Sequence, residues 1–126
     1  MLLFEVTELC TSFSLTVSCL SSGEALFVLI NGGDIPHIGS VSLAWHDQTG
    51  CSMVSGASVP DHLDSEISDM LAKALSSHTG RNVAVACGIH INRATPAMID
   101  EVRQASQVLI ERCKTNLSCK KPTNAS

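Results

Sequence analysis

Phe13-Ser14-Leu15-Thr16-Val17-Ser18-Cys19 alternates apolar with hydroxyl side chains along its whole length. A period of two is typical of a β-strand with one face toward an apolar core and the other toward water. We expect a strand at residues 2–9 before it. Another is expected in the continuous apolar run at residues 25–30, after a turn at residues 21–24. The chain therefore opens with three strands.

Two more strands are expected before the middle of the chain. Residues 41–45 alternate large and small side chains, which again predicts a strand. The sequence Asp-Gln-Thr-Gly at residues 47–50 is typical of a hairpin turn, and residues 51–54 form the predicted returning strand. Residues 55–59 are mostly small, and we expect them to link this hairpin to a helix.

The first helix is predicted from its ends and its apolar stripe. Pro60 and Asp61 suit the first turn, and Gly80 suits the stop. The apolar side chains at helical spacing are Leu63, Ile67, Met70, Leu71, Ala74 and Leu75. Four polar side chains lie outside this stripe and are expected on the polar face: Asp64, Ser68, Asp69 and Lys73.

A short apolar strand at residues 83–87 precedes a second helix, which Thr95 caps and Pro96 begins. The apolar stripe of this helix consists of Met98, Val102, Ala105, Leu109 and Cys113. The chain is polar from residue 115, so we expect one domain at residues 1–114 and a disordered tail at residues 115–126.

The predicted order is five strands, a helix, a strand and a helix. Strands followed by helices favour an α+β domain, with a largely antiparallel sheet and both helices packed on one face. The other face carries serines, threonines and some apolar groups. It is either solvated or in contact with a second copy.

Composition excludes several classes of protein. The chain has 126 residues, a net charge of −4 and only 3% aromatic residues, which argues against nucleic acid and against anionic membranes. We expect no signal peptide, because the first residues lack a basic segment, and no membrane span, because no apolar run approaches about 20 residues. The six cysteines include no CxxC pair and are expected to be reduced thiols in the cytoplasm.

Two segments are candidates for a binding site. The first is the loop at residues 31–39, with three glycines that let backbone N–H groups approach an anion. Its candidate residues are Gly32, Gly33, Asp34, His37 and Gly39. The alternative is a plain hairpin loop with an exposed histidine.

The second segment, residues 88–95, leads from a strand into a helix N-terminus, where the helix dipole favours a negative group. Its candidate residues are His90, Asn92, Arg93 and Thr95, with Arg93 suited to a phosphate. The alternative is a solvated arginine and a histidine satisfied at a strand edge.

Metal binding and catalysis have little support in the sequence. Each of His37 and His90 lacks a second ligand at close spacing, so no metal site is predicted. No nucleophile elbow or spaced acid–base pair occurs, and we expect that the chain is not an enzyme by itself.

Together, the segments Gly32-Gly33-Asp34-Ile35-Pro36-His37-Ile38-Gly39-Ser40-Val41 and Gly88-Ile89-His90-Ile91-Asn92-Arg93-Ala94-Thr95 resemble the prenylated-flavin chaperone family. This family comprises the small accessory proteins of UbiD-type gallate and protocatechuate decarboxylases. The resemblance covers residues 4–113 and implies a fold similar to that of proteasome assembly chaperones. It also implies a homodimer.

For function, the resemblance implies that the chain binds reduced prenylated FMN as cargo and assists its incorporation into the large subunit of the decarboxylase. No decarboxylation would occur on this chain. The nine candidate residues are assigned to cofactor binding from their chemistry and their place in the two motifs. Two alternatives remain: a structural or catalytic small subunit of the decarboxylase, and an assembly chaperone that binds no cofactor.

Overall fold

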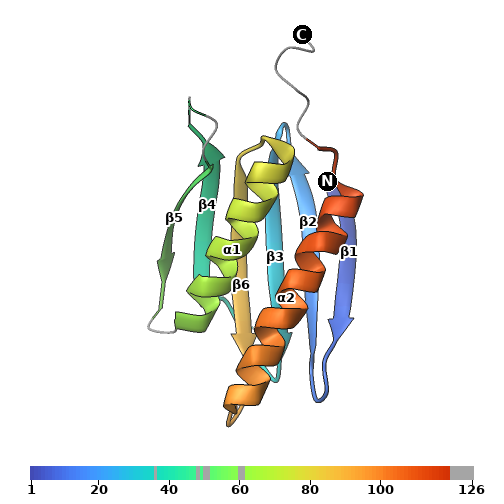
Figure 1. Ribbon diagram of the computed structural model, residues 1–126, viewed down its shortest axis with the longest axis vertical. Helices are drawn as coiled ribbons and strands as arrows, with labels where there is room; N and C mark the ends of the chain where they lie inside the picture. The colour runs from blue at the N-terminus through green and yellow to red at the C-terminus, as the bar shows by residue number, and fades with distance from the viewer. Residues whose placement is uncertain (36, 48, 50–51, 60–61, 120–126) are drawn as a thin grey trace.

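The computed structural model describes residues 1–35, 37–47, 49, 52–59 and 62–119. In chain order the elements are β1 (Leu2–Leu9), β2 (Ser14–Ser22), β3 (Ala25–Gly33), β4 (Ser40–His46), β5 (Ser52–Ser58), α1 (His62–Thr79), β6 (Val83–His90) and α2 (Pro96–Asn116) (Figure 1). This order is the predicted one. Cys51 and the predicted helix start at Pro60 and Asp61 lie outside the described residues.

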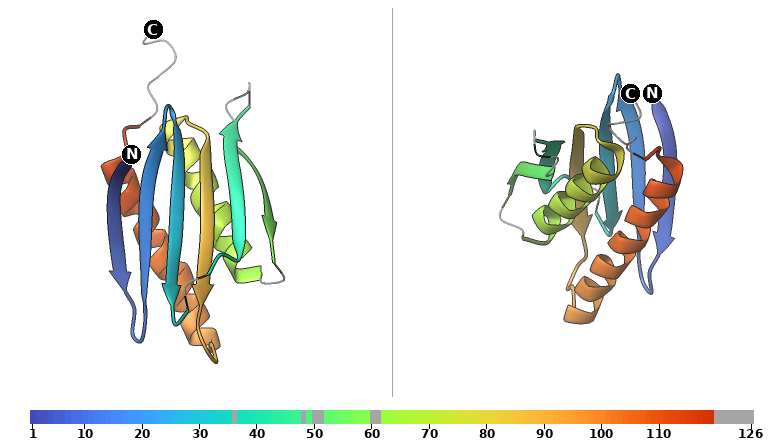
Figure 2. Two further views of the ribbon diagram at one scale, coloured as in Figure 1. Left: turned by 180° about the vertical axis from the view of Figure 1, so that it is seen from behind. Right: turned by 45° about the horizontal axis from the view of Figure 1, so that its top comes forward.

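The described strands form one mixed sheet in the order β1-β2-β3-β6-β4-β5. β3 and β6 pair in parallel, while the other four pairings are antiparallel. Both helices lie across one face of this sheet, and the view from behind shows the strands uncovered (Figure 2). The predicted α+β class, with a largely antiparallel sheet and both helices on one face, is confirmed.

The core lies between the sheet and the helices. In β2, the apolar members of the alternation, Leu15, Val17 and Cys19, are fully buried, as the period of two predicts. Because β6 lies in the middle of the sheet, it is buried at most positions, and Val83 and Val85 have no exposed surface. The strand that follows α1 in the chain is therefore the centre of the sheet.

β4 has the opposite alternation to β2. Ser40 and Ser42 are buried toward α1, whereas Val41 and Leu43 are 43% and 47% exposed on the uncovered face. The buried hydroxyls are satisfied by the helix, since both lie within 2.8 Å of the Ser68 hydroxyl. Hydrogen bonding to α1 therefore orients this strand, and large apolar side chains point away from the core.

The prediction of a linker at residues 55–59 was wrong for most of that range, because β5 continues to Ser58. It pairs with β4 throughout, with Ala57 opposite Val41. Small side chains suit this strand, since a Cβ on Gly56 would lie 2.6 Å from the carbonyl oxygen of Val41. The composition that resembled a linker reflects close packing at the edge of the sheet.

α1 buries its predicted apolar stripe, and Ile67, Leu71 and Leu75 have no exposed surface. The prediction that Asp64 and Ser68 face solvent was wrong, because both are also fully buried. Each lies three residues before a stripe residue, so both share the covered side of the helix. Asp64 is important for the site described below.

α2 begins as predicted, because the Thr95 hydroxyl oxygen accepts a hydrogen bond from the backbone N–H of Met98 at 3.2 Å. The helix continues to Asn116, and the following Leu117 is only 8% exposed. The helix therefore continues two residues beyond residue 114, where the domain was predicted to end.

Three of the described cysteines, Cys19, Cys87 and Cys113, are buried and behave as small apolar residues, whereas Cys119 is exposed. Cys19 and Cys113 are fully buried, and both are free thiols, as are Cys10 and Cys119. Burial raises the pKa of Cys19 to about 11 and that of Cys113 to about 12. Within the described residues, neither helix has the length and apolar character needed to cross a membrane.

Candidate functional site

The two candidate segments meet at one end of the sheet, where the central strands β3 and β6 terminate. Because β3 and β6 are parallel neighbours, their C-terminal ends lie together, with Gly33 opposite His90. The backbone N–H of Asp34 donates to the carbonyl oxygen of His90 at 2.6 Å. Both helices also begin at this end of the molecule, at the bottom of Figure 1. This end of the sheet therefore combines two strand ends with two helix N-termini.

Glycines allow the backbones to approach each other closely at this end of the sheet. Gly33 has a left-handed φ of 84°, and a Cβ on it would overlap the carbonyl oxygen of His90. A Cβ on Gly88 would overlap the carbonyl oxygen of His37 in the same way. Gly33 and Gly88 are thus required by the close approach of β3 and of His37 to β6.

His37 and His90 lie side by side. Their ring centroids are 5.7 Å apart, and the ring planes are perpendicular. His37 Nε2 is 3.2 Å from Asp64 Oδ2, and His90 Nε2 is 3.1 Å from Asn92 Oδ1. The His37 side chain is 30% exposed. The structure therefore brings together two histidines that are far apart in the sequence.

Asp64 was missed by the sequence analysis. Its carboxylate, in the first turn of α1, accepts a hydrogen bond from the backbone N–H of Ile89 at 2.9 Å and lies 3.6 Å from Cys87 Sγ. Its spacing to Ile67 and Leu71 in the helical stripe was the available signal. A carboxylate in an apolar stripe at a helix start is a candidate for a buried, partnered acid.

The segment between β6 and α2 holds the other candidates. Asp34 Oδ2 accepts a hydrogen bond from the backbone N–H of Asn92 at 2.7 Å. Arg93 follows with a left-handed φ of 56°, which is unusual for a side chain other than glycine. Its exposed guanidinium has no hydrogen bond or ion pair with any other described residue. The hydroxyl oxygen of Thr95 accepts the capping bond, which leaves its O–H able to donate.

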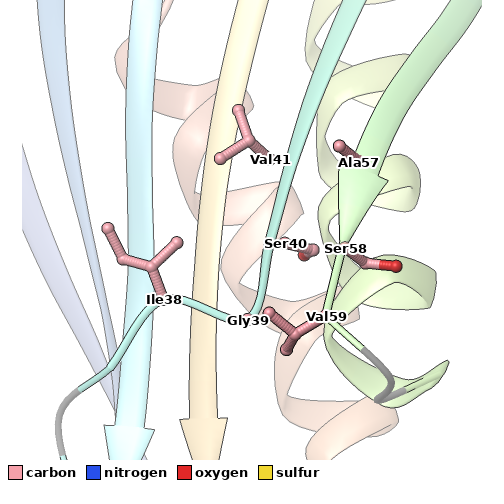
Figure 3. A pocket seen from close by; sticks show the side chains of 7 residues that line it. All are labelled: Ile38, Gly39, Ser40, Val41, Ala57, Ser58 and Val59. Carbon is pink, nitrogen blue, oxygen red and sulfur yellow. The ribbon is translucent and has the colours of Figure 1, made fainter.

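Two apolar hollows lie close to these residues. One has a volume of about 260 Å³ and is lined by Leu63, Ile89, His90, Ile91, Ala94 and Ile99. The other, on the uncovered face, has a volume of about 250 Å³ and is lined by Ile38, Gly39, Ser40, Val41, Ala57, Ser58 and Val59 (Figure 3). Each is smaller than the ~300–1,000 Å³ of a typical ligand pocket. A large ligand would need one hollow and the adjoining surface.

The part of the chain that the structure describes contains no group of three or more potential metal ligands. His37 and His90 are adjacent, but the Nε2 atom of each already lies within hydrogen-bonding distance of another side chain. Among the described residues, this end of the sheet therefore offers a ligand hydrogen bonds, apolar contacts and the unpaired guanidinium of Arg93.

The architecture defines the chain as an α+β domain with both helices on one face of a mixed sheet (Figure 1). It is similar to a chain in the crystal structure of a chaperone complex for yeast 20S proteasome assembly, with a TM-score of 0.65. The two are 14% identical, and the match covers 94% of this chain and 100% of that one. At this identity the likeness shows the fold alone.

The family follows from the sequence match. Residues 10–118 match the prenylated flavin chaperone LpdD-like domain, so the chain belongs to this family. It is also 29% identical, over 82 residues, to protein LpdD of Lactiplantibacillus plantarum. That match covers 61% of this chain and 57% of the relative, so little more than half of that protein's length is matched. The family and the fold expected from the two motifs are confirmed.

Proposed function

We propose that this chain binds reduced prenylated FMN and assists its incorporation into a UbiD-type gallate or protocatechuate decarboxylase. Family membership supports a prenylated-flavin chaperone role. The observation that carries the proposal is that both motifs converge on one end of the sheet, where Gly33 lies opposite His90. That end of the sheet offers separate places for the charged and the apolar parts of such a cargo.

Arg93 is the proposed contact for the phosphate. Its guanidinium is exposed and has no partner within the described residues, and it lies just before the N-terminus of α2. A free cation beside a helix N-terminus favours an anion. Its left-handed backbone is a strained conformation of the kind that clusters at binding sites.

The ring system of the cargo is proposed to contact the apolar hollow between β6 and the two helix starts. The residues that line it include Leu63, His90, Ile91 and Ile99. The nearby carboxylates already accept hydrogen bonds, Asp64 from Ile89 and Asp34 from Asn92. A carrier should hold its cargo without reacting with it, and acids already engaged in this way suit that role.

We also propose that two copies associate through the uncovered sheet face. Two rows cross this face, Phe27–Ala84–Leu43 and Leu29–Ala86–Val41, with small alanines of β6 between larger side chains. The outward positions of β3, β6 and β4 carry no Asp, Glu, Lys or Arg. Such a face meets a second copy without like-charge repulsion, and two-fold association is the commonest symmetry of oligomers.

A reconstitution experiment tests the proposed function. The apo-decarboxylase is mixed anaerobically with limiting reduced prenylated FMN, with and without this chain, and decarboxylation is measured after oxidative maturation. We expect the chain to increase the active fraction and the loaded decarboxylase to remain active after the chain is removed. Activity lost on removal would instead indicate a subunit of the enzyme, and no effect of the chain would contradict the proposal.

The exposed apolar face also favours a second candidate function, that of an assembly chaperone that binds no cofactor. Phe27 and Leu43 are 43% and 47% exposed on it. In that case the chain would promote folding or assembly of the decarboxylase polypeptide. It would then increase the yield of assembled apo-enzyme when no flavin is present, whereas a cofactor carrier would not.

A further inference from the structure

Asp34 is joined to the end of β6 by two hydrogen bonds. Its backbone N–H donates to the carbonyl oxygen of His90 at 2.6 Å, and its Oδ2 accepts from the backbone N–H of Asn92 at 2.7 Å. In a regular parallel ladder, the backbone carbonyl of the same residue would accept the second of these bonds. Here the pairing of β3 with β6 ends one residue earlier, at Gly33 opposite His90, and the side-chain carboxylate takes the place of the carbonyl.

Asn92 has a second contact, through its side chain. Its Oδ1 lies 3.1 Å from His90 Nε2. Asp34, His90 and Asn92 are thus linked pairwise by three hydrogen bonds that form a closed ring. Asp34 comes from the first motif, whereas the other two residues come from the second. Its carboxylate therefore restrains the turn after β6 from a segment that is distant in the sequence.

The turn at residues 91–94 is where the apolar hollow and Arg93 meet. Ile91 and Ala94 line the hollow of about 260 Å³, and the exposed Arg93 lies between them in the chain. Arg93 has a left-handed φ of 56°, a conformation that side chains other than glycine rarely adopt. Such a conformation persists only where surrounding contacts hold it. The bond to the N–H of Asn92, the residue directly before Arg93, supplies a contact of this kind.

We propose that Asp34 is a positioning residue for Arg93. Its carboxylate holds the turn at residues 91–94 so that the guanidinium is presented beside the hollow, and it makes no contact with the cargo. This inference rests on the proposed function, in which Arg93 binds the phosphate. A carboxylate repels a phosphate because both are negative, so holding Asn92 suits Asp34 better than a direct contact does. Asp34 is thereby reassigned from the cofactor contacts expected from the sequence to the support of one of them.

The positioning bond is measured first, without cargo, through the hydrogen exchange rate of the Asn92 amide by NMR. In Asp34→Ala this amide loses its acceptor and should exchange roughly 2- to 10-fold faster, the range expected for one hydrogen bond. Asp34→Asn keeps an acceptor oxygen and should exchange at the wild-type rate. Asp47→Ala is the matched control, because Asp47 Oδ1 accepts from the backbone N–H of Thr49 at 2.9 Å in a different turn. An unchanged Asn92 rate in Asp34→Ala overturns the positioning role whatever the cargo does.

Cargo binding is then measured by anaerobic titration with reduced prenylated FMN. Asp34→Ala should lower the affinity by roughly 2- to 10-fold, because the turn that presents Arg93 is no longer held. Asp34→Asn should bind at least as tightly as the wild type, because it keeps the bond to Asn92 and removes a negative charge. A carboxylate that contacted the cargo would be needed in its charged form, so weaker binding by Asp34→Asn overturns the inference.

A double mutant separates the positioning of Arg93 from a general structural effect. If Asp34 acts through Arg93, Asp34→Ala should cause little further loss of affinity in a chain that already carries Arg93→Ala. A general loss of structure would lower the affinity by the same factor in both backgrounds, and that result overturns the inference. If the wild-type chain does not bind reduced prenylated FMN, the proposed function fails, and the positioning of Arg93 for a cargo fails with it. The exchange rate of Asn92 still decides whether Asp34 holds the turn.

Discussion

Gly33 and His90 lie opposite each other at the end of the parallel β3–β6 pair, and the carbonyl oxygen of His90 occupies the space that a Cβ on Gly33 would need. This pairing joins the two sequence motifs. It forms only because β6, which follows α1 in the chain, inserts between β3 and β4. The candidate site is thus a product of the sheet order.

Gly33→Ala should destabilise the fold more than Gly23→Ala. Both glycines have a left-handed φ, 84° and 58°, but Gly23 has nothing within 4 Å of its Cβ position. Alanine in a left-handed conformation should lower the free energy of unfolding by about 1–2 kcal/mol at each position. The overlap with His90 should lower it by about 1–3 kcal/mol more at Gly33. Urea unfolding measures both. Equal losses would show that the close approach to His90 is not required.

Arg93→Ala should weaken binding of reduced prenylated FMN by about 1–3 kcal/mol, the usual range for loss of a charged hydrogen-bond partner. Arg103→Ala is the matched control, because Arg103 is paired with Glu66 at 2.6 Å on the helix surface. Equilibrium titration under anaerobic conditions measures both affinities. An unchanged affinity in Arg93→Ala would move the phosphate contact to the segment at residues 31–39.

Val41→Lys should convert the proposed dimer to a monomer, because it places a charge in the uncovered face. Val108→Lys is a close control, since both valines are 43% exposed and Val108 lies on α2, on the other side of the molecule. Light scattering after size-exclusion chromatography gives the mass of each variant. A monomeric wild type would rule out association through this face at the concentration used.

The free energy of unfolding should fall as the pH rises above about 9. Burial raises the pKa of Cys19 to about 11 and that of Cys113 to about 12, above the ~8.5 of an unfolded thiol. The unfolded chain then loses protons that the folded chain keeps, so stability is lost by up to about 1.4 kcal/mol per pH unit for each thiol.

Urea unfolding between pH 7 and 10.5 measures this loss, and the absence of tyrosine from the sequence removes one competing titration. Cys19→Ala should make the free energy of unfolding depend less on pH. Cys119→Ala, at an exposed thiol, is the control and should leave the pH dependence unchanged. The same slope in Cys19→Ala and wild type would show that the buried thiol is not its source.

Periodicity predicted the order of strands and helices because the strong patterns are local. The alternation at Phe13–Cys19 and the stripe that contains Ile67 and Leu71 depend only on which side of one element meets the core. β4 shows where this reasoning fails. The alternation at residues 41–45 predicts a strand but not which of its sides faces the core. The hydroxyls of Ser40 and Ser42 hydrogen-bond to α1, so Val41 and Leu43 point outward.

The contacts within the candidate site could be predicted from the sequence only in part. The two motifs identified His37 and His90, but their contact depends on parallel pairing between strands that are distant in the sequence, which no local pattern encodes. Asp64 was assigned to the polar face of a helix because acids usually face water. Only the position of Ile89 and His37 in space shows that this carboxylate has buried partners.

The most direct test of the proposed carrier role is an anaerobic titration of the purified chain with reduced prenylated FMN, followed by absorbance, with oxidised FMN as the control. We predict saturable binding of the reduced prenylated form and much weaker binding of oxidised FMN. Failure to bind either ligand, or equal binding of both, would contradict the role of this chain as a selective carrier of reduced prenylated FMN.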